Sequence, residues 1–228
     1  MAITMYDLLM DLPLLQGISR EHVSALLEKT HIEFSKANAG DVLRRAGDED
    51  NALMYVISGS VEAEWRNHAD DIVITFSEKG RTLLDASHLF GMQRKNPYTY
   101  TAQTDVSLLS IDKSQYLSLL GTQSIYMLNF INYLSLRAQR PMELLAQIDS
   151  CRLRDFLTTW ITTITPSTAR NITLQADKST LMKYTNQSEE SLIADLAEMQ
   201  RQKVIKYSSD IIAIASRESL SDNFRPWS

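Results

Sequence analysis

Hydrophobic and polar positions in the last quarter of the chain follow two different periods. The apolar runs at 204–207 and 211–214 read as two strands joined by a Ser-Ser-Asp turn. Ahead of them, apolar residues recur at helical spacing and predict a helix with one buried side. That side is formed by Leu192, Leu196 and Met199. Over residues 171–214 the pattern therefore predicts a short strand, two helices split by a tight turn, and a closing β-ribbon.

Capping residues support both helices. Asp177 can cap a helix over residues 178–184, and Ser188 is a good N-cap for the second helix. Asn186, between them, tolerates the left-handed backbone of a tight turn. This is the order of a winged helix-turn-helix, whose second helix normally lies in the DNA major groove. The alternative is a small helical subdomain that carries a β-hairpin and binds no nucleic acid.

The first half of the chain has a different character. All seven glycines lie within the first 121 residues, and several separate short runs that resemble strands. Short strands with frequent turn signals favour a β-barrel or β-roll. The segment LLMDLPLLQG and residues 22–27, which come before the strands, look helical. The expected strands are 32–34, 41–45, 53–57, 60–66, 71–76, 101–102 and 106–111.

Residues 113 to about 145 are strongly helical in pattern. One narrow apolar stripe can pack against a second copy of the chain, as in a two-stranded coiled coil. A second face, with Tyr126, Asn129 and Tyr133, can rest on the β-domain; burial of the whole helix within one chain is the alternative. The stripe consists of Met127, Ile131, Leu134, Ala138 and Leu145.

Pro141 interrupts this helical pattern. It removes a backbone donor, so we expect it to kink or end the helix at about Arg137. Asp149 and Ser150, which follow, mark a plausible hinge.

Composition is ordinary for a soluble protein of two modest domains. The chain has 228 residues, of which 44% are hydrophobic and 22% charged. No apolar run reaches the ~20 residues that a membrane span needs. The first residues carry acids rather than a basic segment, so no signal peptide is expected and the cytoplasm is the predicted location.

Charge is unevenly distributed along the chain. The net charge is −5, yet from Cys151 onward ten Lys and Arg face nine Asp and Glu. The excess of acids therefore lies in the first 150 residues. A nearly neutral DNA-reading domain can still bind when its bases gather on one face, but its non-specific affinity should be weak.

Catalytic and metal-binding patterns are missing from the sequence. Cys151 is the single cysteine, and we read it as a buried inert thiol; the four histidines show no metal-ligand spacing. No hydrolase, nucleotide-binding loop, metalloprotease or dinucleotide motif appears. We therefore expect no enzyme activity, no metal and no cofactor.

Several motifs, taken together in this order and spacing, resemble the Crp/Fnr family of bacterial regulators. The resemblance runs from about Leu14 to Ile214, nearly the whole chain. It rests on AGDVL at 39–43, AGD at 46–48, MYVISGSV at 54–61, LFG at 89–91, RL at 152–153, NQSEESL at 186–192 and VI at 204–205.

The resemblance implies an α+β fold in three parts. These are a cyclic-nucleotide-binding-type β-roll (jelly roll) for effector sensing over 1–121, a dimerisation helix and hinge over 122–148, and a winged helix-turn-helix over 149–228. It also implies a homodimer on a palindromic site in double-stranded DNA, through the interface Met127, Ile131, Leu134 and Ala138. RNA polymerase is a candidate further partner.

The sequence departs from the family at the effector pocket. Members that bind a cyclic nucleotide carry an acid after the Phe-Gly pair and an Arg in the next loop that clamps the phosphate. Here Met92 and Asn96 stand at those places, and neither can replace a guanidinium. Arg94 and Lys95 lie nearby but read as a solvated loop. We therefore do not expect cyclic AMP or cyclic GMP as ligand, and the cysteines of an iron–sulfur sensor are absent.

The effector, if one exists, should enter between the β-roll and the long helix. Tyrosines could line an apolar pocket there with hydroxyl handles, although ordinary core packing explains them equally well. The effector identity is not predicted. The candidate pocket residues are Phe90, Gly91, Met92, Asn96, Tyr98, Tyr100, Tyr126 and Tyr133.

The recognition helix departs as well. The family places Arg, Glu and a further Arg where this chain has Glu189, Glu190 and Ala194. A carboxylate can accept a hydrogen bond from cytosine N4, whereas the Arg contact to guanine is missing. We expect an unusual operator and modest affinity. The remaining candidate DNA contacts are Lys178, Ser179, Lys183, Gln187, Ser188, Ser191 and Lys206.

Two functions follow from these patterns. The first is a homodimeric, sequence-specific transcription regulator that is not gated by cyclic AMP. The second is a sensor or interaction module with a cyclic-nucleotide fold that has lost DNA binding. The acidic recognition helix favours the second, and the intact turn, wing and lysines favour the first.

Overall fold

The structure is a computed structural model that describes every residue except 1–8, 11, 18, 20–29, 146–151 and 221–228. Contacts divide the chain into two compact units. The first unit comprises Met1–Val61 and Lys79–Ala138, and the second comprises Glu62–Glu78 and Gln139–Ser228. The predicted helix at 22–27, Cys151 and the predicted hinge at Asp149 and Ser150 lie outside the described residues. The three-part division at residues 121 and 148 stays a prediction.

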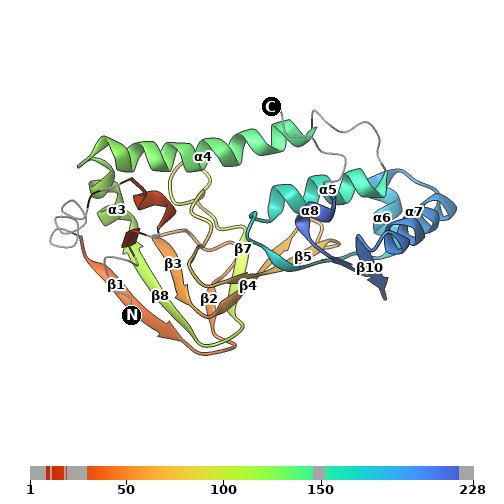
Figure 1. Cartoon of the computed structure of the whole chain (residues 1–228), viewed down its shortest axis with the longest axis horizontal. Coiled ribbons are helices and arrows are strands. Elements are labelled where there is room, and N and C mark those ends of the chain that lie inside the picture. Colours follow the sequence, from red (N-terminus) through yellow and green to blue (C-terminus); the bar gives the residue numbers. More distant parts are fainter. Residues whose placement is uncertain (1–8, 11, 18, 20–29, 146–151, 221–228) are drawn as a thin grey trace. The chain divides into compact units, whose positions relative to one another are not determined.

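Antiparallel strands build the first unit (Figure 1). One sheet has the order β1-β8-β3-β6, and β2 pairs with β7 at the end of the other sheet. The strands are β1 (Ile32–Ala37), β2 (Val42–Arg44), β3 (Ala52–Ser58), β6 (Thr82–Leu83), β7 (Tyr98–Ala102) and β8 (Val106–Asp112). The prediction of an α+β fold that begins with a β-roll is confirmed. Only β6, two residues long, had no counterpart among the expected strands.

The turn after β3 depends on glycine. Gly59 has φ +91°, and a Cβ at this position would collide with the backbone oxygen of Asp105 and the side chain of Val106. Any L-amino acid here would be strained by both its backbone and its neighbours. Gly59 therefore allows β3 to turn closely past the start of β8.

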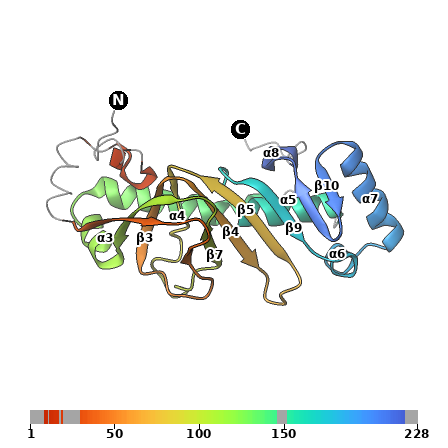
Figure 2. The same cartoon turned by 90° about the horizontal axis from the view of Figure 1, so that it is seen from below.

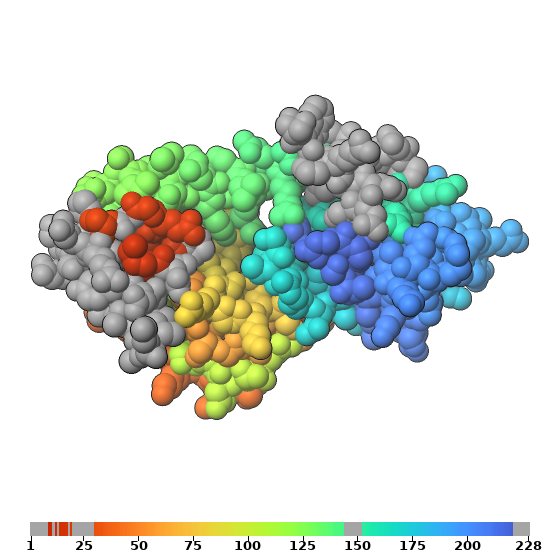
Figure 3. Space-filling view, viewed as in Figure 1, coloured from red at the N-terminus to blue at the C-terminus, as the bar shows by residue number. Residues whose placement is uncertain are grey.

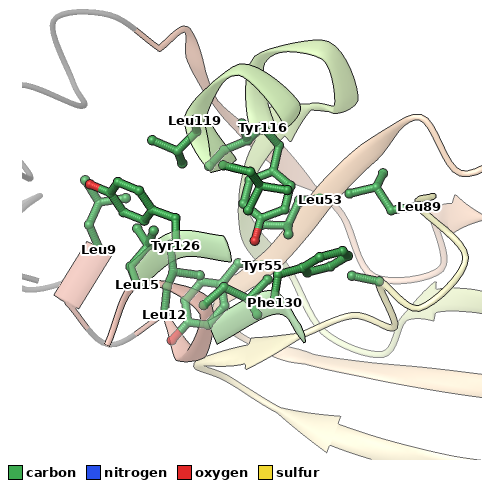
Figure 4. Packing of buried hydrophobic residues seen from close by; sticks show 14 of the residues in the cluster. Leu9, Leu12, Leu15, Leu53, Tyr55, Leu89, Tyr116, Leu119, Tyr126 and Phe130 are labelled. Atoms are coloured by element: carbon green, nitrogen blue, oxygen red, sulfur yellow. The ribbon is translucent and has the colours of Figure 1, made fainter. Parts of the chain in front are cut away.

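Aliphatic and aromatic side chains fill the core of the first unit (Figure 4). Alternate residues of β3, such as Leu53 and Tyr55, point inward and meet Phe130 of the long helix. A short 3-10 helix, η1 (Pro13–Leu15), adds leucines to the same core. Among the described residues of the segment LLMDLPLLQG, residues 9–10 are also helical, as the pattern predicted.

The predicted single helical region from 113 to about 145 forms two helices. These are α3 (Lys113–Leu120) and α4 (Ser124–Leu145). The break follows Gly121, and the Thr122 hydroxyl donates to the Leu119 carbonyl at 2.7 Å, which offers that backbone group a partner outside the helix. The helical pattern is therefore divided between these two helices.

Pro141 does not end α4, because helical residues continue to Leu145, so the helix end, one of the two outcomes predicted for Pro141, does not occur. A proline removes only its own backbone N–H donor, so the backbone hydrogen bonds of the neighbouring residues can maintain the helix on both sides of it.

The second unit is built on the predicted order of a strand, two helices and a ribbon. Its elements are α5 (Leu153–Ile164), β9 (Arg170–Gln175), α6 (Lys178–Thr185), α7 (Glu189–Arg201), β10 (Ile205–Ser208), β11 (Ile211–Ile214) and α8 (Arg217–Leu220). The helix caps form as expected. Asp177 accepts from Thr180 N–H, Ser188 accepts from Ser191 N–H, and Asn186 takes a left-handed backbone with φ 51°.

A hairpin from the β-roll sequence belongs to this second unit. Strands β4 (Ser60–Arg66) and β5 (Val73–Lys79) flank its loop, and β5 pairs with β9. Figure 2 shows β5 beside β9, which lies in turn beside the closing ribbon. The sheet order β10-β11-β9-β5 results. No local sequence signal predicted this pairing.

Candidate functional site

The buried and exposed sides of α7 are cleanly separated. Leu192, Leu196 and Met199 are buried against the rest of the second unit, as the helical spacing predicted. Glu190 and Ala194 are exposed on the opposite side. The side that faces solvent is thus the side that a recognition helix would present to DNA. Ser188, Glu189 and Ser191 are exposed at its amino-terminal end.

Gln187 has its hydrogen-bonding groups engaged within the unit. Its Oε1 accepts from the Leu153 backbone N–H at 3.2 Å, and its Nε2 donates to Ser191 Oγ at 2.9 Å and Asp195 Oδ2 at 2.8 Å. The bond from Leu153 ties the turn between α6 and α7 to the start of α5, and the other two hold it to α7. Gln187 therefore positions the helices, and a DNA contact from it would require these bonds to be exchanged.

Exposed polar and basic groups occupy α6 and the ribbon. Lys178 and Lys206 are exposed and have no ion-pair partner among the described residues. Ser179 Oγ donates to Asp177 Oδ1 at 2.8 Å, and together with the Thr180 backbone N–H, the larger influence, it lowers the pKa of that carboxyl. The Asp177 cap thus stays ionised at neutral pH at the start of α6.

The hairpin loop contacts α6 directly. Asp71 Oδ2 lies 3.7 Å from Lys183 Nζ, and the Tyr184 hydroxyl is 3.0 Å from Asn67 Nδ2. Asn67 Oδ1 also accepts from the backbone N–H groups of Asp71 and Ile72, which holds the loop in shape. A carboxylate beside Lys183 competes with phosphate for the same ammonium group.

Aromatic rings connect the hairpin to α5 and α6. Trp65 meets Trp160 edge to face at 5.6 Å, and Trp160 lies 5.2 Å from Phe156 and 5.6 Å from Tyr184 between ring centroids. Such pairs add to the stabilisation from buried area. The hairpin is therefore packed as part of the second unit.

A different cluster, centred on Asp85, lies in the first unit. The Asp85 side chain is 3% exposed, and it accepts from the Tyr133 hydroxyl at 2.9 Å and lies 3.0 Å from Arg137 Nη2. Ser87 Oγ donates to it at 2.9 Å, and His88 Nδ1 is 3.3 Å away. Burial alone would raise the pKa of Asp85, but His88, Arg137 and Ser87 hold it well below its usual range. Asp85 is thus a buried anion with a full set of partners.

A second buried carboxylate lies close to this cluster. Arg44 Nη1 is 2.7 Å from Asp50 Oδ1 and also donates to the Asp85 backbone carbonyl at 3.2 Å. Burial raises the pKa of Asp50 to about 6, although the charge of Arg44 opposes the shift; the nearby charge of Asp85 adds to it. The two aspartates therefore have pKa values shifted in opposite directions.

The predicted pocket residues are only partly brought together. The Tyr100 hydroxyl accepts from the Asp85 backbone N–H at 3.2 Å, and the ring of Tyr98 lies 5.6 Å from that of Tyr100. Tyr133 bonds to Asp85, as described above. Tyr126 lies in the hydrophobic core instead. The tyrosines thus serve both as core and as hydroxyl partners.

The loop residues of that prediction point elsewhere. Met92 is 99% exposed, and Gly91 is exposed with φ 94°. The Asn96 amide is buried and bonds to the Arg45 and Tyr98 carbonyls, which closes its own loop. Phe90 stacks on Tyr116. None of these side chains supplies a cation for a phosphate group.

The sequence reasoning missed the charged groups of this cluster. A usable signal existed, because an ionisable residue inside a run as apolar as TLLDASHLF needs a buried partner. The partner itself could not be found by local pattern, since Arg137 lies 52 residues away. Among the described residues, no three His, Cys, Asp or Glu side chains could hold a metal ion. The residues missed are Arg44, Asp50, Asp85, His88 and Arg137.

The replacement Asp50→Asn should flatten the pH dependence of folding stability between pH 4 and 6. The folded pKa of about 6 exceeds the unfolded value of about 3.9, so the protonated carboxyl favours the folded state. That contribution is complete below pH 4 and is lost as the pH rises through 6. For a two-unit shift it amounts to at most about 3 kcal/mol.

Denaturant unfolding at a series of pH values measures this effect. The exposed Asp48→Asn is the matched control and should keep the parent profile. An unchanged slope between pH 4 and 6 in Asp50→Asn would contradict the assignment.

The sequence and the structure are similar to those of known proteins. Residues 35–123 match the family described as the cyclic nucleotide-binding domain. No curated protein matches the chain. The crystal structure of the Thermus thermophilus catabolite activator protein is similar with a TM-score of 0.54 and 18% identity, covering 92% of this chain and 97% of that one.

A second solved structure, DNR from Pseudomonas aeruginosa, has a TM-score of 0.48 and 18% identity over 97% of this chain and 98% of that one. At 18% identity the likeness to the catabolite activator protein shows the fold alone, which is a cyclic nucleotide-binding-type β-roll followed by helices. None of the described helices is both long and apolar enough to cross a membrane.

Proposed function

We propose that the chain is a homodimeric, sequence-specific DNA-binding transcription regulator of the Crp/Fnr type, which acts in the cytoplasm and is not gated by cyclic AMP. The observation that carries the proposal is the capped pair α6 and α7 with its closing ribbon, in the order of a winged helix-turn-helix. The similarity in fold to a catabolite activator protein over 92% of the chain supports it. RNA polymerase is a further partner under this proposal.

The exposed side of α4 supports the dimer. Met127 is 40% exposed and Ile131 is 49% exposed, and both line a shallow groove at the start of α4. Leu134, by contrast, packs toward the core cluster, and Ala138 is exposed. Figure 3 shows α4 (green) open at the surface along one side. An apolar stripe on a long exposed helix is well suited to a second copy of itself.

Replacing Ile131 by Glu should convert the dimer to monomers. A charge in a paired apolar seam must be desolvated without a partner, and we expect dimer dissociation at least about 100-fold more favourable. Analytical ultracentrifugation across a concentration series measures it. The neighbouring exposed Asn132→Glu is the control and should stay dimeric. A dimeric Ile131→Glu protein would place the interface elsewhere.

Cyclic AMP is not expected to regulate the protein because Met92 and Asn96 stand where the family has its acid and arginine, and the arginines near Asp50 and Asp85 are paired with these carboxylates. Arg44 is paired with Asp50, and Arg137 with Asp85. Arg94, which precedes the predicted loop, is paired with Glu49 at 3.2 Å. An anionic ligand would have to displace a carboxylate at each of these sites.

Selection of bound sequences from a random duplex pool, at two salt concentrations, tests the proposal. We expect enrichment of a two-fold symmetric site with half-sites about one helical turn apart. No enrichment at either salt, from a folded dimeric protein, would overturn it.

The second candidate function is an interaction module without DNA binding. It is favoured by Glu189 and Glu190, which are exposed in the first turn of α7, where a phosphate would otherwise approach. A protein that selects no duplex yet remains dimeric would support this reading.

A further inference from the structure

The exposed face of α7 is unusual in its chemistry. At 100° per residue, four side chains opposite the buried leucines fall within an arc of about 100°. All four are exposed, and Ile193 retains 46% of its accessible surface. The face consists of Glu190, Ile193, Ala194 and Ala197. It is apolar in its middle and acidic at its amino-terminal end.

The cation at the end of this face is already paired. Arg201 donates from Nε to Glu198 Oε2 at 2.9 Å and from Nη2 to Glu198 Oε1 at 2.7 Å. The nearest amide of the preceding turn, Gln187, is bound to Ser191 and Asp195. No free guanidinium is therefore available on this face to make the usual two-donor contact to guanine O6 and N7.

An apolar side chain can still read one feature of the major groove. The C5 methyl group of thymine is the apolar group among the base edges there, and Ala, Thr or Phe contacts use it. Ile193 is larger than alanine and lies one helical turn after Glu190. The neighbouring Ala194 and Ala197 are small, so bases can approach the helix closely. The Glu190 carboxylate can accept a hydrogen bond from the N4 amino group of cytosine.

We propose that Ile193, together with Ala194 and Ala197, determines specificity by contacting thymine methyl groups in the operator half-site. This rests on the proposed DNA-binding function. The expected half-site contains a thymine step beside a cytosine contacted by Glu190, and no guanine contacted by α7. Exposed Lys178 on α6 can hold a phosphate beside these bases, since backbone contacts position a protein without reading sequence.

Replacement of each thymine in the selected duplex by deoxyuridine tests the contact. Deoxyuridine keeps the hydrogen-bonding edge and lacks only the methyl group. We expect binding of the parent protein to weaken by about 3- to 10-fold at one or two half-site positions. For Ile193→Ser, the ratio of affinities for the two duplexes should approach one.

Ile211→Ser serves as the matched control, because Ile211 is also exposed but lies on β11. It should keep the parent ratio whatever it does to overall affinity. Circular dichroism establishes that both variants are folded.

The outcomes separate this proposal from the one on which it rests. An enriched duplex whose thymines can all be replaced without loss, or an unchanged ratio in Ile193→Ser, overturns the thymine contact and leaves the regulator intact. Failure of any duplex to be enriched overturns both and assigns the apolar face of α7 to a protein partner.

Discussion

The replacement Asp85→Ala should destabilise the first unit by about 3 kcal/mol at pH 7. The replacement removes the Asp85 carboxylate, which pairs with Arg137 and accepts hydrogen bonds from the hydroxyl groups of Tyr133 and Ser87. Removing one member of a buried pair costs about 3–5 kcal/mol because the other charge is left without a partner. Arg137 is 31% exposed, so water can compensate in part and the lower end of that range applies.

The pH dependence of this loss follows from the depressed pKa of Asp85. A carboxyl whose folded pKa lies below its unfolded value stabilises the fold above pH 4, and that contribution is lost as the pH falls. The difference in free energy of unfolding between the parent protein and Asp85→Ala should therefore decrease as the pH falls below 4.

Tryptophan fluorescence is a poor probe of the first unit, because Trp65 and Trp160 both lie in the second unit. Unfolding by denaturant is therefore followed by far-UV circular dichroism. Tyr133→Phe, which removes one hydroxyl, should cost only about 1 kcal/mol. A loss in Asp85→Ala no larger than that would contradict a central role for Asp85.

Trp160→Ala should destabilise the second unit by about 3 kcal/mol. Trp160 is the ring that contacts Trp65 of the hairpin, Phe156 of α5 and Tyr184 of α6. Truncation of a large aromatic residue removes its burial and leaves a cavity among the remaining rings. Denaturant unfolding followed by circular dichroism measures the loss, and the exposed Thr163→Ala on the same helix is the control.

A double-mutant cycle with Trp65→Ala then tests whether the hairpin is part of this unit. Coupling between the two rings should be about 0.5–1.5 kcal/mol. Additive losses would show that the hairpin packs independently of α5.

Local patterns predicted the second unit well because its determinants are close together in the sequence. The caps at Asp177 and Ser188 each act on an amide three residues away, and Asn186 needs only its own backbone conformation. Strand β4 was predicted with its observed bounds, 60–66, for the same reason. A capping bond or a turn is specified by a few neighbouring residues, so it can be recognised without knowing the rest of the fold.

Local patterns failed where one competing interaction decided the outcome. The helical pattern from 113 to 145 is real, yet Gly121 and the Thr122 side chain divide it. Pro141 carries a strong signal for a helix end, yet the helix continues past it. In each case the pattern averages over many residues, whereas the outcome depended on one or two backbone bonds.

The sequence by itself determined most of the elements, their order, and the buried face of α7, since these follow from residue type and period alone. Only the tertiary structure decided that Asp85 meets Arg137, that Asp71 meets Lys183, and that β5 pairs with β9. Each of these contacts joins residues more than 50 positions apart. The physical reason is that burial and charge pairing act through space, and a one-dimensional pattern contains neither the distance nor the partner.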